Sequence, residues 1–235
     1  MIVGRLGILV VLASACSGKA DGRDGQADRR TAGQDSASTA RPPARPSAFR
    51  PTVLFLGTSL TAGYGLPDPA LAYPALIQAK LDSAGRPFRV VNAGVSGESS
   101  AGALARIDWL LRQSPAAVLV IETGANDGLR GQDPDSVRGR IQHIIDRAGR
   151  QQPPPKIVLL GMEAMPNLGS DYVRRFRAIY PALARANGAV LVPFLLAQVA
   201  GVDSLNQDDG IHPTPAGQRI LAEHVWQAIE LVTRR

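Results

Sequence analysis

The chain has 235 residues, enough for one sizeable domain with a full hydrophobic core and an additional segment. Its formal charge is +6, but residues 1–50 hold 8 Lys and Arg against 4 Asp, whereas residues 51–235 hold 18 against 16 Asp and Glu. Because the larger part is nearly balanced and its arginines are dispersed, composition argues against nucleic acid as a partner. The single cysteine, Cys16, excludes an intramolecular disulfide.

Residues 1–16 are predicted to be a secretory signal segment. Its apolar stretch GILVVLASA has nine residues, too few to span a bilayer of about 30 Å. The last three residues of this stretch and Cys16 form ASAC, which resembles the bacterial lipoprotein signal, in which the cysteine becomes lipidated. We therefore expect a lipid anchor at Cys16 and a place in the bacterial cell envelope, across the inner membrane and facing the periplasm. An ordinary cleaved signal with an incidental cysteine is the alternative.

Residues 17–50 are predicted to be a disordered tether. They are rich in Gly, Ser, Asp, Arg and Pro and contain one aromatic residue, Phe49. Such a composition cannot bury enough apolar area to offset the entropy of ordering the chain. The folded domain is therefore expected at residues 51–235.

From Pro51 onward, short apolar runs alternate with amphipathic stretches. Five runs are typical of strands buried on both faces: TVLFLG, FRVVNAG, AAVLVIET, KIVLLG and AVLVPF. Helical patterns cover Ala72–Ala84, Ser99–Gln113, Pro134–Arg150, Ser170–Asn187 and Pro215 to about Thr233. Strands that alternate with helices predict a three-layer α/β/α sandwich with a parallel sheet of about five strands.

Ligands of such sheets bind beyond the carboxyl ends of the strands, and Ser59 follows the first strand in FLGTSLTAGYGL. A serine in such a turn is more often a turn former than a nucleophile. His212 in DDGIHPTPAG changes this interpretation, because a serine nucleophile needs a neighbouring base and that base needs an orienting partner. Asp209, three residues earlier, suits the partner better than Asp208. The remaining histidines lie in helical patterns and are interpreted as surface or flanking residues: His143 and His224.

Acyl transfer also needs hydrogen-bond donors aimed at the developing oxyanion. Gly97 in NAGVSGESS lacks a side chain, so its backbone N–H can approach a substrate closely. Asn126 in ETGANDGLRG offers a side-chain amide. We expect these two residues to be the candidate donors.

Four segments carry a family resemblance: GTSLTAGYGL, NAGVSGESSAG, ETGANDGLRG and DDGIHP. In this order and spacing they resemble the four blocks of the SGNH (GDSL) hydrolases, closest to the bacterial arylesterase and thioesterase I/lysophospholipase branch. The resemblance covers about Thr52–Val232 and implies a flavodoxin-like fold. It implies a Ser59–His212–Asp209 triad and an oxyanion hole formed by the Ser59 N–H, Gly97 and Asn126.

Thr58 departs from the family motif, which has aspartate at this position. In the family this aspartate is outside the triad and helps to hold the nucleophile loop. Threonine can accept a backbone hydrogen bond and form a local turn bond, though more weakly. We therefore expect Thr58 to retune the loop without abolishing catalysis.

The resemblance implies a serine esterase for short- to medium-chain acyl esters, thioesters or lysophospholipids, and we expect the protein to be a monomer. It implies no cofactor, and the scattered histidines offer no metal ligand cluster. The loop after the fourth predicted strand would help to line the acyl pocket, although plain packing explains its residues equally well: Met162, Met165, Leu168 and Tyr172. The alternatives are an O-deacetylase of envelope carbohydrate and a catalytically silent, surface-binding lipoprotein.

Overall fold

The computed structural model describes residues 50–234, so the predicted signal segment, Cys16 and residues 17–49 of the predicted tether lie outside it. In chain order the elements are β1 (Thr52–Gly57), α1 (Ser59–Ala62), η1 (Pro69–Leu71), α2 (Tyr73–Ser83), β2 (Arg89–Gly94), α3 (Ser100–Gln113), β3 (Ala116–Ile121), α4 (Ala125–Leu129), α5 (Pro134–Ala148), β4 (Lys156–Leu160), η2 (Pro166–Leu168), α6 (Ser170–Asn187), β5 (Val190–Val192), η3 (Asp203–Leu205) and α7 (Pro215–Thr233).

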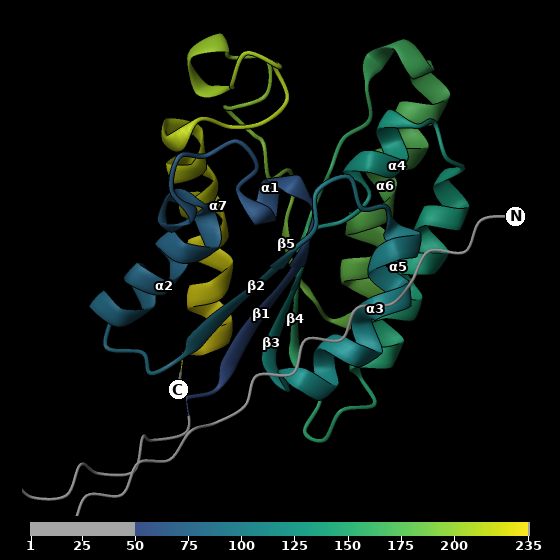
Figure 1. Cartoon of the computed structure of the whole chain (residues 1–235). Helices are drawn as coiled ribbons and strands as arrows, with labels where there is room; N and C mark the ends of the chain where they lie inside the picture. Colours follow the sequence, from purple (N-terminus) through teal and green to yellow (C-terminus); the bar gives the residue numbers. More distant parts are fainter. Residues whose placement is uncertain (1–49, 235) are drawn as a thin grey trace, which may run out of the picture. The chain divides into compact units, whose positions relative to one another are not determined.

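The five strands form one parallel sheet with the order β2-β1-β3-β4-β5 (Figure 1). From β1 the chain crosses to β2 at the edge and then returns past β1 to β3. The order therefore reverses between β1 and β3, and a crevice opens at the carboxyl ends of strands where such a reversal occurs. The topology thus directs attention to the segments that follow β1 and β3.

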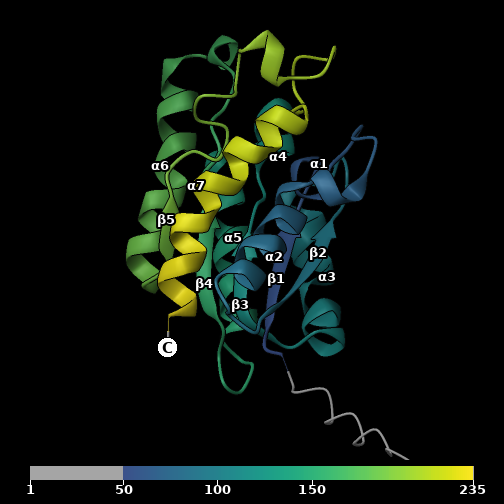
Figure 2. The ribbon, with the colours of Figure 1, turned by 90° about the vertical axis from the view of Figure 1, so that its left-hand side faces the viewer.

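Helices cover both faces of the sheet, which confirms the predicted three-layer α/β sandwich. α2 and α7 pack on one face, and α3, α5 and α6 pack on the other (Figures 1 and 2). The core includes β1, β3 and β4, and all six residues of β1 are buried. β2 and β5 are only partly buried, contrary to the expectation for all five strands, because each lies at an edge of the sheet.

The predicted helices agree with the observed ones to within about two residues at either end. Two short helices, α1 and α4, were not predicted, because four or five residues are too few to display a helical period. Both follow strands that border the crevice, so these two α-helices lie where the candidate catalytic residues are expected.

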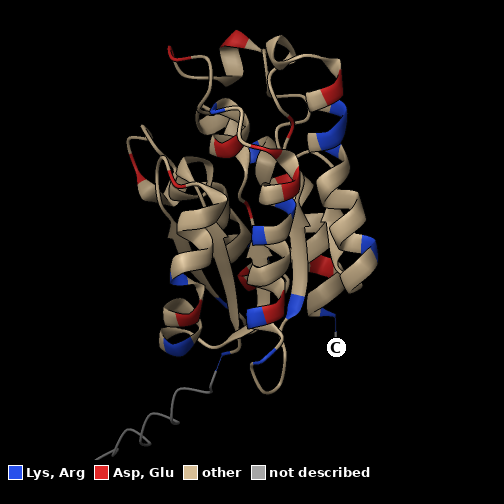
Figure 3. Cartoon of the chain, turned by 90° about the vertical axis from the view of Figure 1, so that its right-hand side faces the viewer, with Lys and Arg blue, Asp and Glu red and all other residues tan. Residues whose placement is uncertain are grey.

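Charge is dispersed over the described part of the chain. Figure 3 shows basic and acidic residues interspersed along the helices of one side. Among residues 50–234, no helix combines the length and apolar character needed to cross a membrane.

Gly94 provides a test of how tightly the end of β2 packs on α1. A Cβ atom at Gly94 would lie 2.2 Å from the Ala62 backbone nitrogen and 2.8 Å from the Thr58 carbonyl oxygen. Backbone atoms at such distances must shift, so Gly94→Ala should lower the free energy of unfolding by about 1–3 kcal/mol or more in urea titrations. The control is Gly139→Ala in α5, where a Cβ meets no atom within 4 Å. It should raise stability by about 0.5–1 kcal/mol, and equal effects of the two substitutions would contradict the packing described.

Candidate active site

Ser59 lies at the start of α1, two residues after Gly57, the last residue of β1, and is 9% exposed. α1 is a single turn, and Gly63 ends it in the left-handed region with φ of 75°. The Gly63 N–H donates to the Ser59 carbonyl at 3.0 Å. The strand and this closed turn together fix the backbone that carries the serine.

His212 lies in the loop before α7 and faces Ser59. Its Nε2 is 2.9 Å from the Ser59 Oγ, and its Nδ1 is 2.6 Å from Asp209 Oδ2. Asp209 Oδ1 accepts from the backbone N–H groups of Ile211 and His212 at 2.9 and 3.0 Å. The structure thus brings the three predicted residues into one hydrogen-bonded chain. Asp208 is exposed, and Asp209 is the aspartate in contact with the imidazole.

Asp209 is held in its ionised form. The hydrogen bond from the His212 side chain, followed by the backbone donors, lowers the pKa of Asp209 from 3.8 to about 2. A carboxylate accepts from the Nδ1–H of an imidazole, which leaves Nε2 with a lone pair directed at the serine hydroxyl. This arrangement is suited to removing the serine proton.

Tyr64 was not identified from the sequence but borders the same site. Its ring centroid lies 4.7 Å from that of His212, and the side chain is 54% exposed. Gln207 Nε2 donates to the carbonyls of Tyr64 and Pro213 at 2.8 and 3.1 Å, and so ties the His212 loop to the segment after α1.

The candidate oxyanion donors lie on the loops after β2 and β3. Gly97 has φ of +77°, and a Cβ there would meet no atom within 4 Å, so its backbone borders open space. Asn126 Nδ2 donates to the Glu98 carbonyl at 3.0 Å. An amide has two N–H groups, so one such bond orients Asn126 while leaving the other proton available.

The loop that contains Gly97 is anchored by an ion pair at the next residue, Glu98. Arg106 Nε and Nη2 each lie 2.6 Å from the Glu98 carboxylate, in a bidentate arrangement. The same guanidinium donates to the Ala93 carbonyl at 2.7 Å, at the end of β2. Arg130 Nη2 donates to the Gly97 carbonyl at 3.1 Å. Two arginines thus fix the loop that presents the candidate donor.

Glu122, directly after β3, is a buried carboxyl group that the sequence did not single out. It is 0% exposed and accepts from the Thr58 backbone N–H at 2.7 Å and from the Thr61 hydroxyl at 2.8 Å. Removal from water is the main influence on this group, and it raises the pKa of Glu122 from 4.5 to about 7. The four-residue helix α1 is therefore hydrogen-bonded to a buried carboxyl group whose pKa lies near neutrality.

Thr58 makes a side-chain contact that the sequence did not indicate. Its side chain makes no capping hydrogen bond to α1. The hydroxyl instead donates to both oxygens of Glu122, at 3.0 Å each. This contact comes from a residue 64 positions away in the sequence. The expectation that Thr58 retunes the loop without abolishing catalysis stays a prediction.

The four predicted pocket residues have different environments. Met162 is 2% exposed and belongs to the hydrophobic core, so the packing alternative describes it better than a pocket wall does. Tyr172 is partly buried and donates its hydroxyl to the Gln132 carbonyl at 2.7 Å. Leu168 is partly buried as well, whereas Met165 is 52% exposed.

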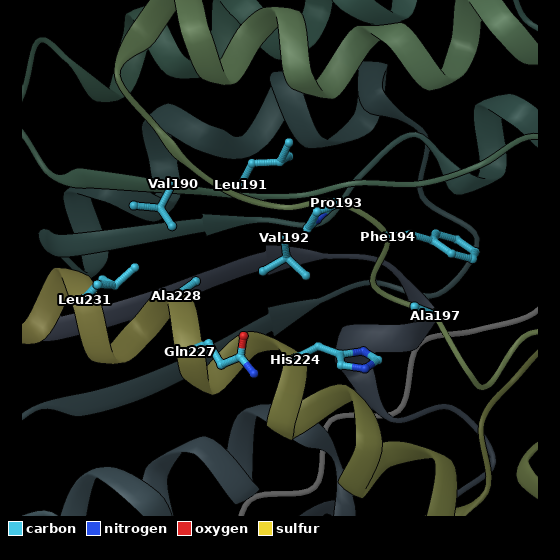
Figure 4. A pocket seen from close by; sticks show the side chains of 10 residues that line it. All are labelled: Val190, Leu191, Val192, Pro193, Phe194, Ala197, His224, Gln227, Ala228 and Leu231. Atoms are coloured by element: carbon cyan, nitrogen blue, oxygen red, sulfur yellow. The ribbon is translucent and has the colours of Figure 1, made fainter.

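Two hollows in the surface are lined by residues other than Ser59. One, of about 330 Å³, is bounded by β5, the segment after it and α7, whose side chains face one another across it (Figure 4). The other, of about 470 Å³, is lined by residues of α6. In the described part of the chain, no group of His, Cys, Asp and Glu could hold a metal ion. His143 is exposed, and His224 Nδ1 lies 3.2 Å from the Leu195 carbonyl oxygen, so neither histidine contributes to the Ser59 site.

Comparisons with known proteins agree on one family. The model of the GDSL-like Lipase/Acylhydrolase family matches residues 55–220. The chain is 41% identical over 179 residues to Esterase TesA of Pseudomonas aeruginosa, covering 76% of this chain and 88% of that protein. It is 37% identical over 185 residues to Thioesterase 1/protease 1/lysophospholipase L1 of Escherichia coli K12, covering 79% and 85%. The solved psychrotrophic esterase EstA from Pseudoalteromonas sp., inhibited by monoethylphosphonate, has a TM-score of 0.71 at 30% identity and covers 77% of this chain and 97% of its own.

Glu122 should leave a signature in the pH dependence of stability. Its pKa is about 7 in the folded protein against 4.5 as the ordinary value, so between these pH values the folded state binds more protons than the unfolded state. Stability from this group is therefore fully present below pH 4.5 and is lost as the pH rises toward and through 7, by about 2–3 kcal/mol between pH 5 and pH 8.

The measurement is urea unfolding at pH 5 and pH 8 for the wild type and Glu122→Gln. The free energy of unfolding should fall more steeply with pH in the wild type, because glutamine does not titrate. Using the difference between the two pH values cancels any pH-independent effect of the substitution. Identical pH dependence in both proteins would show that Glu122 does not titrate in this range.

Proposed function

The chain belongs to the GDSL-like lipase/acylhydrolase family and is an ester hydrolase, and we propose that it is a serine esterase with Ser59 as nucleophile. His212 is the proposed general base and Asp209 its orienting partner. The observation that carries the proposal is the unbroken chain of hydrogen bonds from Ser59 Oγ through His212 to Asp209, at 2.9 and 2.6 Å.

In the first proposed step, Ser59 Oγ attacks the carbonyl carbon of the ester while His212 Nε2 takes the hydroxyl proton. The ionised Asp209 stabilises the imidazolium that forms. As the tetrahedral intermediate collapses, the imidazolium gives this proton to the leaving alcohol oxygen, and an acyl-serine remains. Water then attacks the acyl group with His212 again as base, which releases the acid and regenerates the Ser59 hydroxyl.

The proposed oxyanion hole consists of the backbone N–H groups of Ser59 and Gly97 and the side-chain amide of Asn126. It is supported by the open space beside Gly97 and by the hydrogen bond from Asn126 to the Glu98 carbonyl, which fixes the amide. Preorganised donors of this kind stabilise charge that develops in the transition state without reorganising at the moment of reaction.

The proposed substrates are short- to medium-chain carboxylic esters, with thioesters and lysophospholipids as further candidates. The names of the bacterial relatives, esterase and thioesterase/lysophospholipase, support this range. The Pseudoalteromonas esterase was inhibited by monoethylphosphonate, whose tetrahedral phosphorus resembles the intermediate of acyl transfer, and we expect the same inhibition here.

Replacement of the nucleophile tests the proposal directly. Ser59→Ala should lower kcat for p-nitrophenyl acetate by at least about 10³-fold, because the remaining groups can polarise the carbonyl but cannot form the acyl-enzyme. Ser83→Ala, an exposed serine at the end of α2, is the matched control and should hydrolyse the ester as the wild type does. Unchanged hydrolysis by Ser59→Ala would overturn the assignment.

The acyl preference is tested with p-nitrophenyl esters from acetate to palmitate beside acetylated xylan. We expect the highest kcat/KM among the short- and medium-chain esters and little release of acetate from the polysaccharide. Faster deacetylation of xylan than hydrolysis of any p-nitrophenyl ester would favour the carbohydrate O-deacetylase alternative.

A further inference from the structure

The buried carboxyl group of Glu122 lies beneath the turn that carries Ser59. The Glu122 backbone N–H donates to the Leu56 carbonyl at 2.8 Å, which continues the pairing of β3 with β1 beyond the end of β3. This pairing carries the side chain to the junction of β1 and α1. The group is therefore placed by the sheet, the most rigid part of the fold.

Three donors converge on this carboxylate from both sides of Ser59. Thr58, the preceding residue, contributes its backbone N–H at 2.7 Å and its hydroxyl at 3.0 Å. Thr61, two residues after Ser59, contributes its hydroxyl at 2.8 Å. The nucleophile is therefore bracketed by two residues that bind the same carboxyl group.

These hydrogen bonds are suited to an ionised carboxylate. When Glu122 is ionised, Thr61 donates its single hydroxyl proton to it at 2.8 Å, and the Tyr73 hydroxyl at 2.6 Å then donates to the Thr61 oxygen. In this state Tyr73 donates a hydrogen bond to Thr61 and Thr61 donates one to Glu122. Thr58 donates to the same carboxylate from the other side of Ser59. A carboxylate accepts at both oxygens, whereas an amide in its place would offer one acceptor oxygen.

Glu122 is held by neutral donors. No ion pair among residues 50–234 includes it, and it is 0% exposed. The titratable groups nearest to it are Tyr73 from α2 and Tyr180 from α6. Burial, and after it the charge of Glu122, raises the pKa of both hydroxyls. A buried charge without a cation is unfavourable for folding, so a position that served packing alone would be better filled by a neutral side chain.

The backbone is shaped to admit this carboxylate. A Cβ at Gly57 would lie 2.0 Å from the Thr61 hydroxyl oxygen and 2.9 Å from Glu122 Oε2. Only glycine leaves room for the hydrogen bond between these two groups. Gly57, Thr58, Thr61 and Glu122 therefore form one unit around the nucleophile.

We propose that Glu122 is a positioning residue: its buried carboxylate fixes Thr58 and Thr61 and thereby holds the Ser59 Oγ and N–H in their working directions. This inference rests on Ser59 being the nucleophile. It also explains Thr58 itself. A threonine hydroxyl donates to the carboxylate or accepts from the protonated acid, whereas an aspartate would set a second carboxylate against the first and require a shared proton.

The first test compares Thr58→Val with Thr58→Ser. Valine has nearly the shape of threonine and keeps the backbone N–H but removes the hydroxyl donor, so kcat for p-nitrophenyl acetate should fall about tenfold while KM stays within twofold. Serine restores the donor and should recover kcat to within about twofold of the wild type. Equal kcat values for the valine variant and the wild type would overturn the role of the Thr58 hydroxyl.

The second test uses the acidic limb of the pH profile. Glu122→Ala would leave three buried donors unpaired and impair folding, so Glu122→Gln is the informative variant. In the wild type, log kcat/KM should fall by more than one unit for each pH unit on the acidic limb, because protonation of both His212 and Glu122 lowers activity. In Glu122→Gln the slope should be one, with kcat reduced at pH 8.

The two proposals fail in different ways. Retained activity in Ser59→Ala would overturn the proposed nucleophile. Loss of activity in Ser59→Ala, together with a kcat and acidic slope in Glu122→Gln that equal those of the wild type, would overturn only the positioning role of Glu122.

Discussion

The hydrogen bond between Ser59 Oγ and His212 Nε2, 2.9 Å long, joins residues 153 positions apart, and much of the fold is needed to maintain it. On one side, β1 and the Glu122 carboxylate fix the serine turn. On the other, Asp209 and its backbone donors fix the imidazole. The buried amide of Gln218 in α7 connects the two sides, since it accepts from the Tyr73 N–H at 2.9 Å and donates to the Leu60 carbonyl at 3.4 Å.

The parallel sheet explains why these groups meet. β1 and β3 are neighbours whose following segments leave on different paths, so the crevice at their carboxyl ends is bounded by α1 and by the start of α4. The site is therefore built from short turns on a rigid sheet, and its polar groups are placed by backbone pairing. The electrostatic design has two different carboxylates: Asp209 is ionised with a pKa of about 2, whereas buried Glu122 titrates near 7.

Much of the fold was predictable, because buried strands and amphipathic helices have strong periodic signals. Ser59, Asp209 and His212 were identified because each belongs to a short sequence motif that indicates its chemistry without information on distant contacts. Glu122 was overlooked, since a single glutamate after a strand resembles any strand end and its partners lie 61 and 64 residues away. The contact between Thr58 and Glu122 was missed for the same reason. Met162 resembled a pocket residue by its place in a loop, although tertiary packing buries it.

Ser59 is the residue proposed to become acylated, and the most direct test is to locate a covalent adduct. The folded protein is treated with a fluorophosphonate, digested and examined by peptide mass spectrometry. We expect one adduct per chain, on Ser59, and slower formation of this adduct when His212 is replaced by alanine. An adduct on another serine, or no adduct in a protein that still hydrolyses p-nitrophenyl acetate, would contradict this assignment.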